Sequence, residues 1–280
     1  MRFAKGHGTQ NDFVIVFDPD DSHELTAGLA ARLCDRRAGI GGDGVLRAVR
    51  QRAAGSPGWF MDYRNADGSL AEMCGNGVRV FARYLVAHGL ASGPEFTVAT
   101  RAGDRQVRLE PDGQITVDMG AVTVLGPGQA VVAGQTHEGL RISAGNPHLA
   151  CLVERPLAEF DLTRPPALDH GQFPDGANVE LVRLTGGGTL AMRVHERGSG
   201  ETRSCGTGAV AAAAAATRAR GEQQGAWQVT VPGGTLGVVI TAESSRLTGP
   251  AVIVAEGELD PGWLAGGWPS RPAERQPAGR

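Results

Sequence analysis

Two segments with the same pattern decide the fold: Ala71-Glu72-Met73-Cys74-Gly75-Asn76-Gly77-Val78 and Thr202-Arg203-Ser204-Cys205-Gly206-Thr207-Gly208-Ala209. Each contains Cys-Gly-x-Gly and leads into an apolar run with helical spacing, which predicts helices over 75–88 and 206–220. The two cysteines are 131 residues apart, close to half of the 280-residue chain. We infer a duplicated half-domain with a cysteine at the start of the main helix of each half.

The remaining segments indicate an α+β protein. Many short β-rich runs are separated by turn residues, and a third helix is predicted over 25–36. The main helix of the second half contains Ala211 to Ala216 and has little polar surface, and the first has a wide apolar face. Helices that are apolar nearly all round are buried. We therefore expect two pseudo-symmetric half-domains, each a curved mixed or antiparallel sheet around a central helix.

The half-domains are predicted to span 1–117, with Cys74, and 118–249, with Cys205. A C-terminal strand within 250–262 is expected to join the first half. Residues 263–280 are rich in Gly, Pro and Arg and are expected to form a flexible tail.

Composition excludes several classes of protein. The net charge is −3, so no basic field for nucleic acid is present. No apolar run approaches the roughly 18 residues that a membrane span needs, and the N-terminus lacks the apolar core of a signal peptide. We expect a cytoplasmic protein that binds neither nucleic acid nor membrane. Lys5 is the single lysine and stands in no supporting motif, which argues against a pyridoxal phosphate enzyme and against a P-loop.

Four cysteines are too sparse for a disulfide scaffold, and no CxxC pair or HExxH motif is present. We therefore expect no metal site and no cofactor. Cys34 and Cys151 lack the glycine setting of the other two and are expected to be core residues.

A cysteine at a helix N-terminus has a specific chemistry. The free N–H groups and the positive dipole end favour the thiolate and bind carboxylates. A single such cysteine is more often structural than catalytic. If two helix starts face each other, however, one thiolate can remove a proton from a bound carbon and the opposite thiol can return one to the other face. Such a pair would invert a stereocentre.

Five motifs surround this pattern: Gly8-Thr9-Gln10-Asn11-Asp12-Phe13, Asn65-Ala66-Asp67-Gly68-Ser69, Glu72-Met73-Cys74-Gly75-Asn76-Gly77, Gly145-Asn146-Pro147-His148 and Glu196-Arg197-Gly198-Ser199-Gly200-Glu201-Thr202-Arg203-Ser204-Cys205-Gly206-Thr207-Gly208. With them, roughly residues 2–262 resemble the diaminopimelate epimerase family. The resemblance implies that family's fold and a pyridoxal-phosphate-independent isomerase of lysine and peptidoglycan precursor synthesis. It also implies a homodimer.

Site residues follow from the same resemblance. Cys74 and Cys205 match the two acid/base thiols, and His148 and Glu196 match residues that tune their pKa values. Arg197 suits the distal carboxylate of the substrate, because a guanidinium pairs with a carboxylate in a fork. The positions that match substrate contacts are Asn11, Asn65, Gly75, Asn76, Asn146, Asn178, Glu196, Arg197, Gly206 and Thr207.

One position departs from the family pattern. Gly44 stands where some members have a glutamine, so a side-chain contact there is lost or replaced by backbone. Two alternatives stay open. The chain could be a proline or hydroxyproline racemase of the same superfamily, but those racemases typically have a histidine where Asn76 stands, so the asparagine favours diaminopimelate. It could also be an inactive relative, which would bind amino acids without removing the α-hydrogen.

Overall fold

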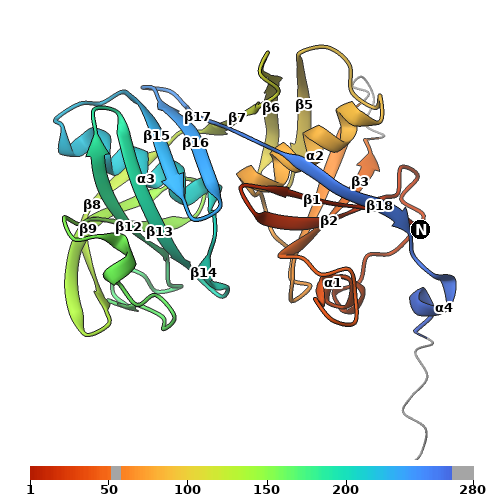
Figure 1. The fold of residues 1–280 in the computed structure, drawn as a ribbon, viewed down its shortest axis with the longest axis horizontal. Coiled ribbons are helices and arrows are strands. Elements are labelled where there is room, and N and C mark those ends of the chain that lie inside the picture. The colour runs from red at the N-terminus through yellow and green to blue at the C-terminus, as the bar shows by residue number, and fades with distance from the viewer. Residues whose placement is uncertain (52–57, 267–280) are drawn as a thin grey trace, which may run out of the picture.

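The structure is a computed structural model that describes residues 1–51 and 58–266. Of the predicted tail, 267–280 lies outside the described residues. Two halves stand side by side, and each has a helix surrounded by strands (Figure 1). This is the α+β arrangement that the sequence predicts.

The first half contains α1 (Ala27–Cys34), α2 (Gly75–Ala87) and a short C-terminal helix, α4 (Pro261–Leu264). Its strands are β1 (Arg2–Gly8), β2 (Asn11–Phe17), β3 (Gly44–Arg50), β4 (Trp59–Asn65), β5 (Glu95–Thr100), β6 (Gly103–Leu109), β7 (Ile115–Gly120) and β18 (Val252–Glu258).

The second half contains α3 (Gly206–Ala219) and a 3₁₀ turn, η1 (Leu157–Glu159). Its strands are β8 (Thr123–Val132), β9 (Gln135–Ser143), β10 (Pro147–Leu152), β11 (Ala167–Leu168), β12 (Asn178–Gly186), β13 (Thr189–Glu196), β14 (Gly200–Thr202), β15 (Gly225–Val231), β16 (Gly234–Ile240) and β17 (Ser245–Gly249).

The strand order repeats between the halves. In the first half it is β18-β1-β2-β3-β4-β5-β6-β7, and only the β2–β3 and β4–β5 pairs are parallel. In the second half it is β8-β9-β10-β12-β13-β15-β16-β17, with parallel pairs at the corresponding places, β10–β12 and β13–β15. In each half the central helix lies in the connection across the second parallel pair. The internal repeat seen in the sequence is therefore a repeat of topology.

Antiparallel pairing of β7 with β17 joins the two halves, and Leu247 lies opposite Val117. The chain enters the second half after β7 and returns after β17 as β18, which pairs with β1 (Figure 1). The predicted boundaries, 117/118 and 249/250, fall within or beside the β7–β17 pair.

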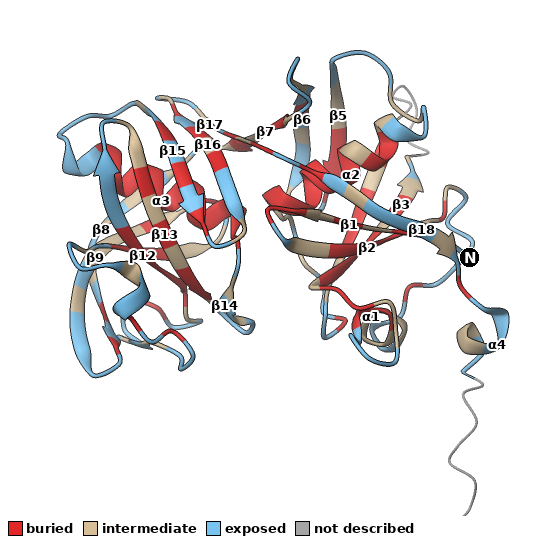
Figure 2. Cartoon of the chain, in the orientation of Figure 1, coloured by how far each residue is buried: buried red, intermediate tan, exposed pale blue. Residues whose placement is uncertain are grey.

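Both central helices are buried in the cores of their halves (Figure 2). On α2, Val78, Phe81 and Leu85 are fully buried. On α3, Ala211 to Ala216 are all buried, and the small side chains let strands approach the helix from several sides. The predicted helices, 75–88 and 206–220, match α2 and α3 to within one residue at each end.

Strand β1 has no strand prediction in the sequence, because its inward positions carry small residues. Ala4, Gly6 and Gly8 alternate along it, and a Cβ on Gly6 would lie 2.9 Å from Val80 Cγ1 of α2. The strand passes so close to the helix that a larger side chain would not fit. The alternation of apolar and polar residues that predicts a strand is therefore absent from this segment.

Within the described ranges, no helix is long and apolar enough to cross a membrane. The same ranges hold no group of three His, Cys, Asp or Glu side chains able to bind a metal ion.

Candidate active site at the paired helix N-termini

Each half of the fold presents its cysteine in the same local geometry. Cys74 is the N-cap of α2 with φ −139° and ψ 120°, and Cys205 is the N-cap of α3 with φ −124° and ψ 121°. Each sulfur accepts a hydrogen bond of 3.4 Å from the backbone N–H three residues further along the chain. The donor is Gly77 for Cys74 and Gly208 for Cys205. Each cysteine thus caps the N-terminus of its helix, a role that Ser or Asp has at many helix starts.

The two helix starts abut each other. A Cβ built on Gly206 would lie 3.2 Å from the Cα of Gly75 and 3.3 Å from the backbone nitrogen of Asn76. Leu247 packs against both glycines from β17. A Cβ would be tight at either glycine, so the two helix N-termini, with their free N–H groups, lie against each other. This close approach is what the duplicated Cys-Gly-x-Gly provides.

Cys74 is partly buried and lies beside Asn11 at the start of β2. Its thiol lies 3.7 Å from Asn11 Oδ1, which also accepts from Asn76 Nδ2 at 3.1 Å. Asn76 Nδ2 lies 3.1 Å from the carbonyl oxygen of Ser204, the residue before Cys205. One asparagine side chain therefore connects the surroundings of both cysteines.

Cys205 is buried, and its neighbours come from β12 and β13. Asn178 Nδ2 lies 3.8 Å from its sulfur, and Thr207 Oγ1 lies 3.5 Å from it. The Cys205 thiol also contacts the half-buried carboxylate of Glu196, which accepts a hydrogen bond from Thr202. An asparagine amide therefore lies next to each cysteine, Asn11 of β2 beside Cys74 and Asn178 of β12 beside Cys205.

The N–H groups of the helix starts lower the pKa values of both thiols, as expected, but burial acts more strongly in the opposite direction. Burial raises the pKa of Cys74 to about 11, although the N–H of Gly77 and the charge of Arg79 act in the opposite direction. Burial, together with the charges of Glu196 and Glu180, raises the pKa of Cys205 well above its ordinary value. Loss of water outweighs these hydrogen bonds, so the net shift of both thiol pKa values is upward.

His148 lies behind this region and is fully buried. Its Nδ1 is 2.7 Å from Glu180 Oε1, and its Nε2 is 2.9 Å from Asn146 Oδ1. Glu180 is a residue that the sequence did not single out. Its Oε1 would lie 2.8 Å from a Cβ on Gly208, so the carboxylate sits under the start of α3. The signal available in the sequence was a charged residue within the apolar run Val179–Val182.

Two predicted substrate contacts, Asn65 and Arg197, lie at turns and bond to other protein groups. Asn65 Nδ2 donates to Ser69 Oγ at 3.0 Å, within the turn after β4. Arg197 is exposed, and its guanidinium donates to the carbonyl oxygen of Asp175 at 2.9 Å. The backbone N–H of Arg197 donates to Asn178 Oδ1 at 2.9 Å, which places this turn beside Cys205.

Gly44 faces Tyr63, a second residue that the sequence did not single out. A Cβ on Gly44 would lie 2.6 Å from Tyr63 Cε2 and 2.6 Å from the carbonyl oxygen of Arg64, so no side chain fits there. Tyr63 is buried, and burial raises the pKa of its hydroxyl, with further contributions from Cys74 and Glu196. The tyrosine ring therefore occupies the space beside Gly44 and reaches the cysteine site.

A charged cluster fixes the orientation of Asn11. Asn11 Nδ2 donates to Asp43 Oδ2 at 2.7 Å. Asp43 and Asp12 both pair with Arg36, and Asp12 also pairs with Lys5 at 2.6 Å. The single lysine is thus used in this cluster, and the amide oxygen of Asn11 is left facing Cys74.

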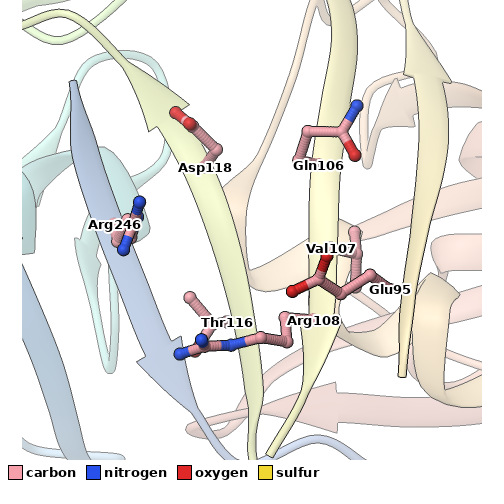
Figure 3. Close-up of a pocket in the computed structure, with 7 residues that line it drawn as sticks. All are labelled: Glu95, Gln106, Val107, Arg108, Thr116, Asp118 and Arg246. Atoms are coloured by element: carbon pink, nitrogen blue, oxygen red, sulfur yellow. The ribbon is translucent and has the colours of Figure 1, made fainter. Parts of the chain in front are cut away.

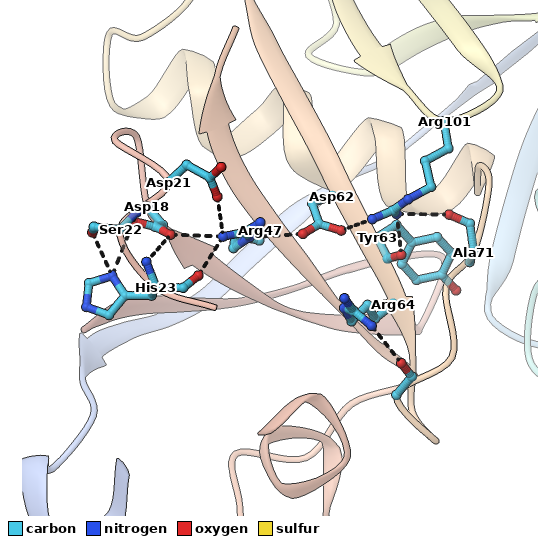
Figure 4. Close-up of polar contacts among 11 residues, drawn as sticks. Asp18, Asp21, Ser22, His23, Arg47, Asp62, Tyr63, Arg64, Ala71 and Arg101 are labelled. Carbon is cyan, nitrogen blue, oxygen red and sulfur yellow. Dashed lines mark hydrogen bonds and ion pairs between the residues drawn. The ribbon is translucent and has the colours of Figure 1, made fainter. Parts of the chain in front are cut away.

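A second cluster supports the segment that leads to Cys74 (Figure 4). Asp62 lies between Arg47 and Arg101 and pairs with both. Arg101 Nη1 also donates to the carbonyl oxygens of Tyr63 at 2.8 Å and Ala71 at 3.3 Å. These bonds attach the segment before Cys74 to the end of β5.

A cavity of about 250 Å³ lies elsewhere, beside β6, β7 and β17 (Figure 3). Charged side chains line much of it, among them Glu95, Arg108, Asp118 and Arg246. None of the predicted site residues is part of this lining.

Two topologically equivalent half-domains, each with a cysteine at the start of its central helix, define the fold shared by PhzF proteins, proline racemases and diaminopimelate epimerases. Solved structures show the same fold. A phenazine biosynthesis protein of the PhzF family from Bacillus anthracis matches with a TM-score of 0.68 at 16% identity, covering 92% of this chain and 98% of that one. A probable proline racemase from Agrobacterium radiobacter K84 matches with a TM-score of 0.63 at 14% identity, covering 92% of each chain.

Sequence comparison identifies the family. The diaminopimelate epimerase family model matches residues 3–125 and 140–258, and the chain belongs to this family. It is 61% identical to a diaminopimelate epimerase of Thermobifida fusca (strain YX), covering 92% of this chain and 98% of that one. It is 50% identical to a diaminopimelate epimerase of Mycolicibacterium smegmatis, covering 94% of this chain and 98% of that one.

Proposed function

We propose that this chain interconverts LL- and meso-2,6-diaminopimelate with Cys74 and Cys205 as its acid/base pair. Membership of the diaminopimelate epimerase family supports the substrate. The observation that carries the mechanism is the contact between the two helix starts at Gly75 and Gly206, each preceded by a cysteine.

The reaction moves protons only. The thiolate of one cysteine takes the α-proton and becomes a thiol, which leaves a carbanion stabilised by the adjacent carboxylate. The opposite thiol gives its proton to the other face of the carbon and becomes a thiolate. The protonation states of the two sulfurs are exchanged after each turnover, and no group needs to be oxidised or reduced.

Backbone groups would hold the reacting carboxylate. The N–H groups of Gly75, Asn76, Gly206 and Thr207 belong to the first turns of α2 and α3 and have no acceptor within their own helices. Negative charge grows on the carboxylate as the carbanion forms, so donors fixed in advance favour that state over the bound substrate. Asn65, Asn146, Asn178, Glu196 and Arg197 would contact the rest of the substrate, with His148 and Glu196 tuning the thiols.

Exchange of the α-hydrogen with solvent tests the proposal. Reduced protein in D2O should exchange the α-hydrogen of diaminopimelate, as measured by proton NMR, and should form the second stereoisomer from LL substrate. Binding without exchange would instead identify an amino-acid-binding relative. Exchange of proline or hydroxyproline, but not of diaminopimelate, would identify a racemase of the related class. Either outcome contradicts the proposal.

We further infer a homodimer in the cytoplasm. Strand β18 pairs on one side with β1, and Val252 and Val254 on this strand are exposed. A second copy of the chain would cover them. All four cysteines are free thiols, as expected in a reducing compartment. Light scattering of the purified protein and cell fractionation test these two inferences, and a monomer or a membrane-associated protein would contradict them.

A further inference from the structure

Arg79 is a fully buried arginine in the second turn of α2, and it is the largest of the fully buried side chains. Its burial is unusual because an arginine is almost never fully buried unless it is paired. The proton transfers described above do not use it directly.

Within the described part of the chain, the guanidinium is bonded only to neutral oxygen atoms. Nη2 donates to Asn76 Oδ1 at 2.8 Å, and Nη1 donates to the carbonyl oxygen of Gly75 at 3.3 Å. The remaining bonds are longer, 3.5 Å each, to Thr9 Oγ1 and the carbonyl oxygen of Pro250. Over residues 1–51 and 58–266, no carboxylate forms an ion pair with it. The positive charge is buried without a negative partner.

Glycines in two strands make room for this side chain. A Cβ on Gly8 of β1 would lie 3.1 Å from Arg79 Nη2, and a Cβ on Gly249 of β17 would lie 3.4 Å from its Nε. The guanidinium is therefore packed closely against the backbone of β1 at Gly8 and lies in ordinary contact distance of Gly249, although burying a cation is costly.

Arg79 closes a ring of hydrogen bonds that connects the two halves. Asn76 accepts from Arg79 and donates to Ser204 Oγ at 3.2 Å. Ser204 Oγ lies 2.6 Å from Thr9 Oγ1, and Thr9 accepts from Arg79. Ser204 comes from the second half and immediately precedes Cys205, so the guanidinium lies directly behind the region where both helices begin.

The reaction itself supplies the missing negative charge. Burial lowers the pKa of Arg79 to about 10, and a thiolate at Cys74 would raise it again. Conversely, the charge of Arg79 lowers the pKa of Cys74. Within the described residues, the other titratable groups near Cys74 are Glu196 of β13, Tyr63 of β4 and the opposing Cys205, and each of them carries either negative charge or none.

We propose that Arg79 is the fixed counter-charge of the site, a positioning residue whose buried guanidinium balances the thiolate of Cys74 and the substrate carboxylate while it holds Asn76 between the halves. This inference rests on the proposed two-thiol reaction. A buried cation can stabilise charge that appears during the reaction without any reorganisation.

Alkylation of Cys74 by iodoacetamide measures the thiolate without substrate or turnover. The full-length reduced protein is alkylated between pH 6 and 10, and the modified Cys74 peptide is quantified by mass spectrometry. This range lies below the Cys74 pKa of about 11, so Arg79→Gln should be alkylated about tenfold more slowly at each pH, which corresponds to a rise of about one unit in that pKa. Arg79→Lys keeps the charge and should stay close to the wild-type rate. Arg83→Gln removes a charge one turn further along α2 and should change nothing.

A second variant keeps the test independent of folding. Asn76→Asp places a carboxylate against Arg79 and neutralises its charge without emptying the cavity, so it should slow alkylation as Arg79→Gln does. Wild-type alkylation rates in a folded Arg79→Gln protein, or in Asn76→Asp if Arg79→Gln does not fold, would overturn the proposal. If the cysteine variants still turned over, the two-thiol reaction would fail while the alkylation result for Arg79 would stand.

Discussion

Removal of the Asp43 carboxylate tests whether the charged cluster controls the site through Asn11. Asp43 Oδ2 accepts from Asn11 Nδ2 at 2.7 Å and from the backbone N–H of Asp12 at 3.1 Å. In Asp43→Ala the Asn11 amide loses this anchor and can rotate, so its oxygen no longer stays beside Cys74. We expect the catalytic activity to fall more than the stability.

The magnitude follows from the bond that is lost. A hydrogen bond to a charged group contributes about 1.5–3 kcal/mol. If this orientation energy is needed in the transition state, kcat/KM falls about 10- to 150-fold. The loss of stability is smaller, because burial and the charge of Asp12 already raise the pKa of Asp43 and make its charged form unfavourable.

The assay follows α-proton exchange of diaminopimelate in D2O, together with the melting temperature. Asp35→Ala is a matched control, since this carboxylate binds the N–H groups of Arg37 and Ala38 in the connection after α1. Activity of Asp43→Ala within twofold of wild type, with the fold intact, would refute the idea that Asp43 orients Asn11.

Four other predictions concern the cysteines and the tyrosine beside them. Cys74→Ser and Cys205→Ser should each lose at least about 100-fold in epimerisation, because a hydroxyl is a far weaker base than a thiolate; near-normal turnover in either would contradict the two-thiol scheme. Mild oxidation should inactivate the protein reversibly by forming a Cys74–Cys205 disulfide, which mass spectrometry would identify; activity indifferent to oxidant would count against their closeness. Gly44→Ala should destabilise the fold by about 1–3 kcal/mol, because Tyr63 and a backbone oxygen fill the space, and an unchanged denaturation midpoint would refute that packing. Burial raises the pKa of Cys151 to about 12. The buried thiol therefore stabilises the fold below pH 9, and the free energy of unfolding falls by about 1.4 kcal/mol per pH unit as the pH rises from 9 to 12. If the unfolding free energy of Cys151→Ala fell with the same alkaline slope as that of wild type, the raised pKa of Cys151 would be refuted.

The sequence by itself determined the repeat and the helices that carry it. Cys-Gly-x-Gly before an apolar run fixes a helix start through contacts among neighbouring residues, so α2 and α3 could be predicted closely. The family motifs likewise identified Asn11 and Asn178, which the structure places next to Cys74 and Cys205.

Only the tertiary structure decided the electrostatics. The thiol pKa values rise because distant segments exclude water from the sulfurs, an effect that no local pattern encodes. In the same way, Glu180 and Arg79 became part of the site, and Tyr63 came to lie over Gly44, through packing between strands and helices far apart in sequence. Capping is a property of adjacent residues, whereas desolvation is a property of everything that surrounds an atom.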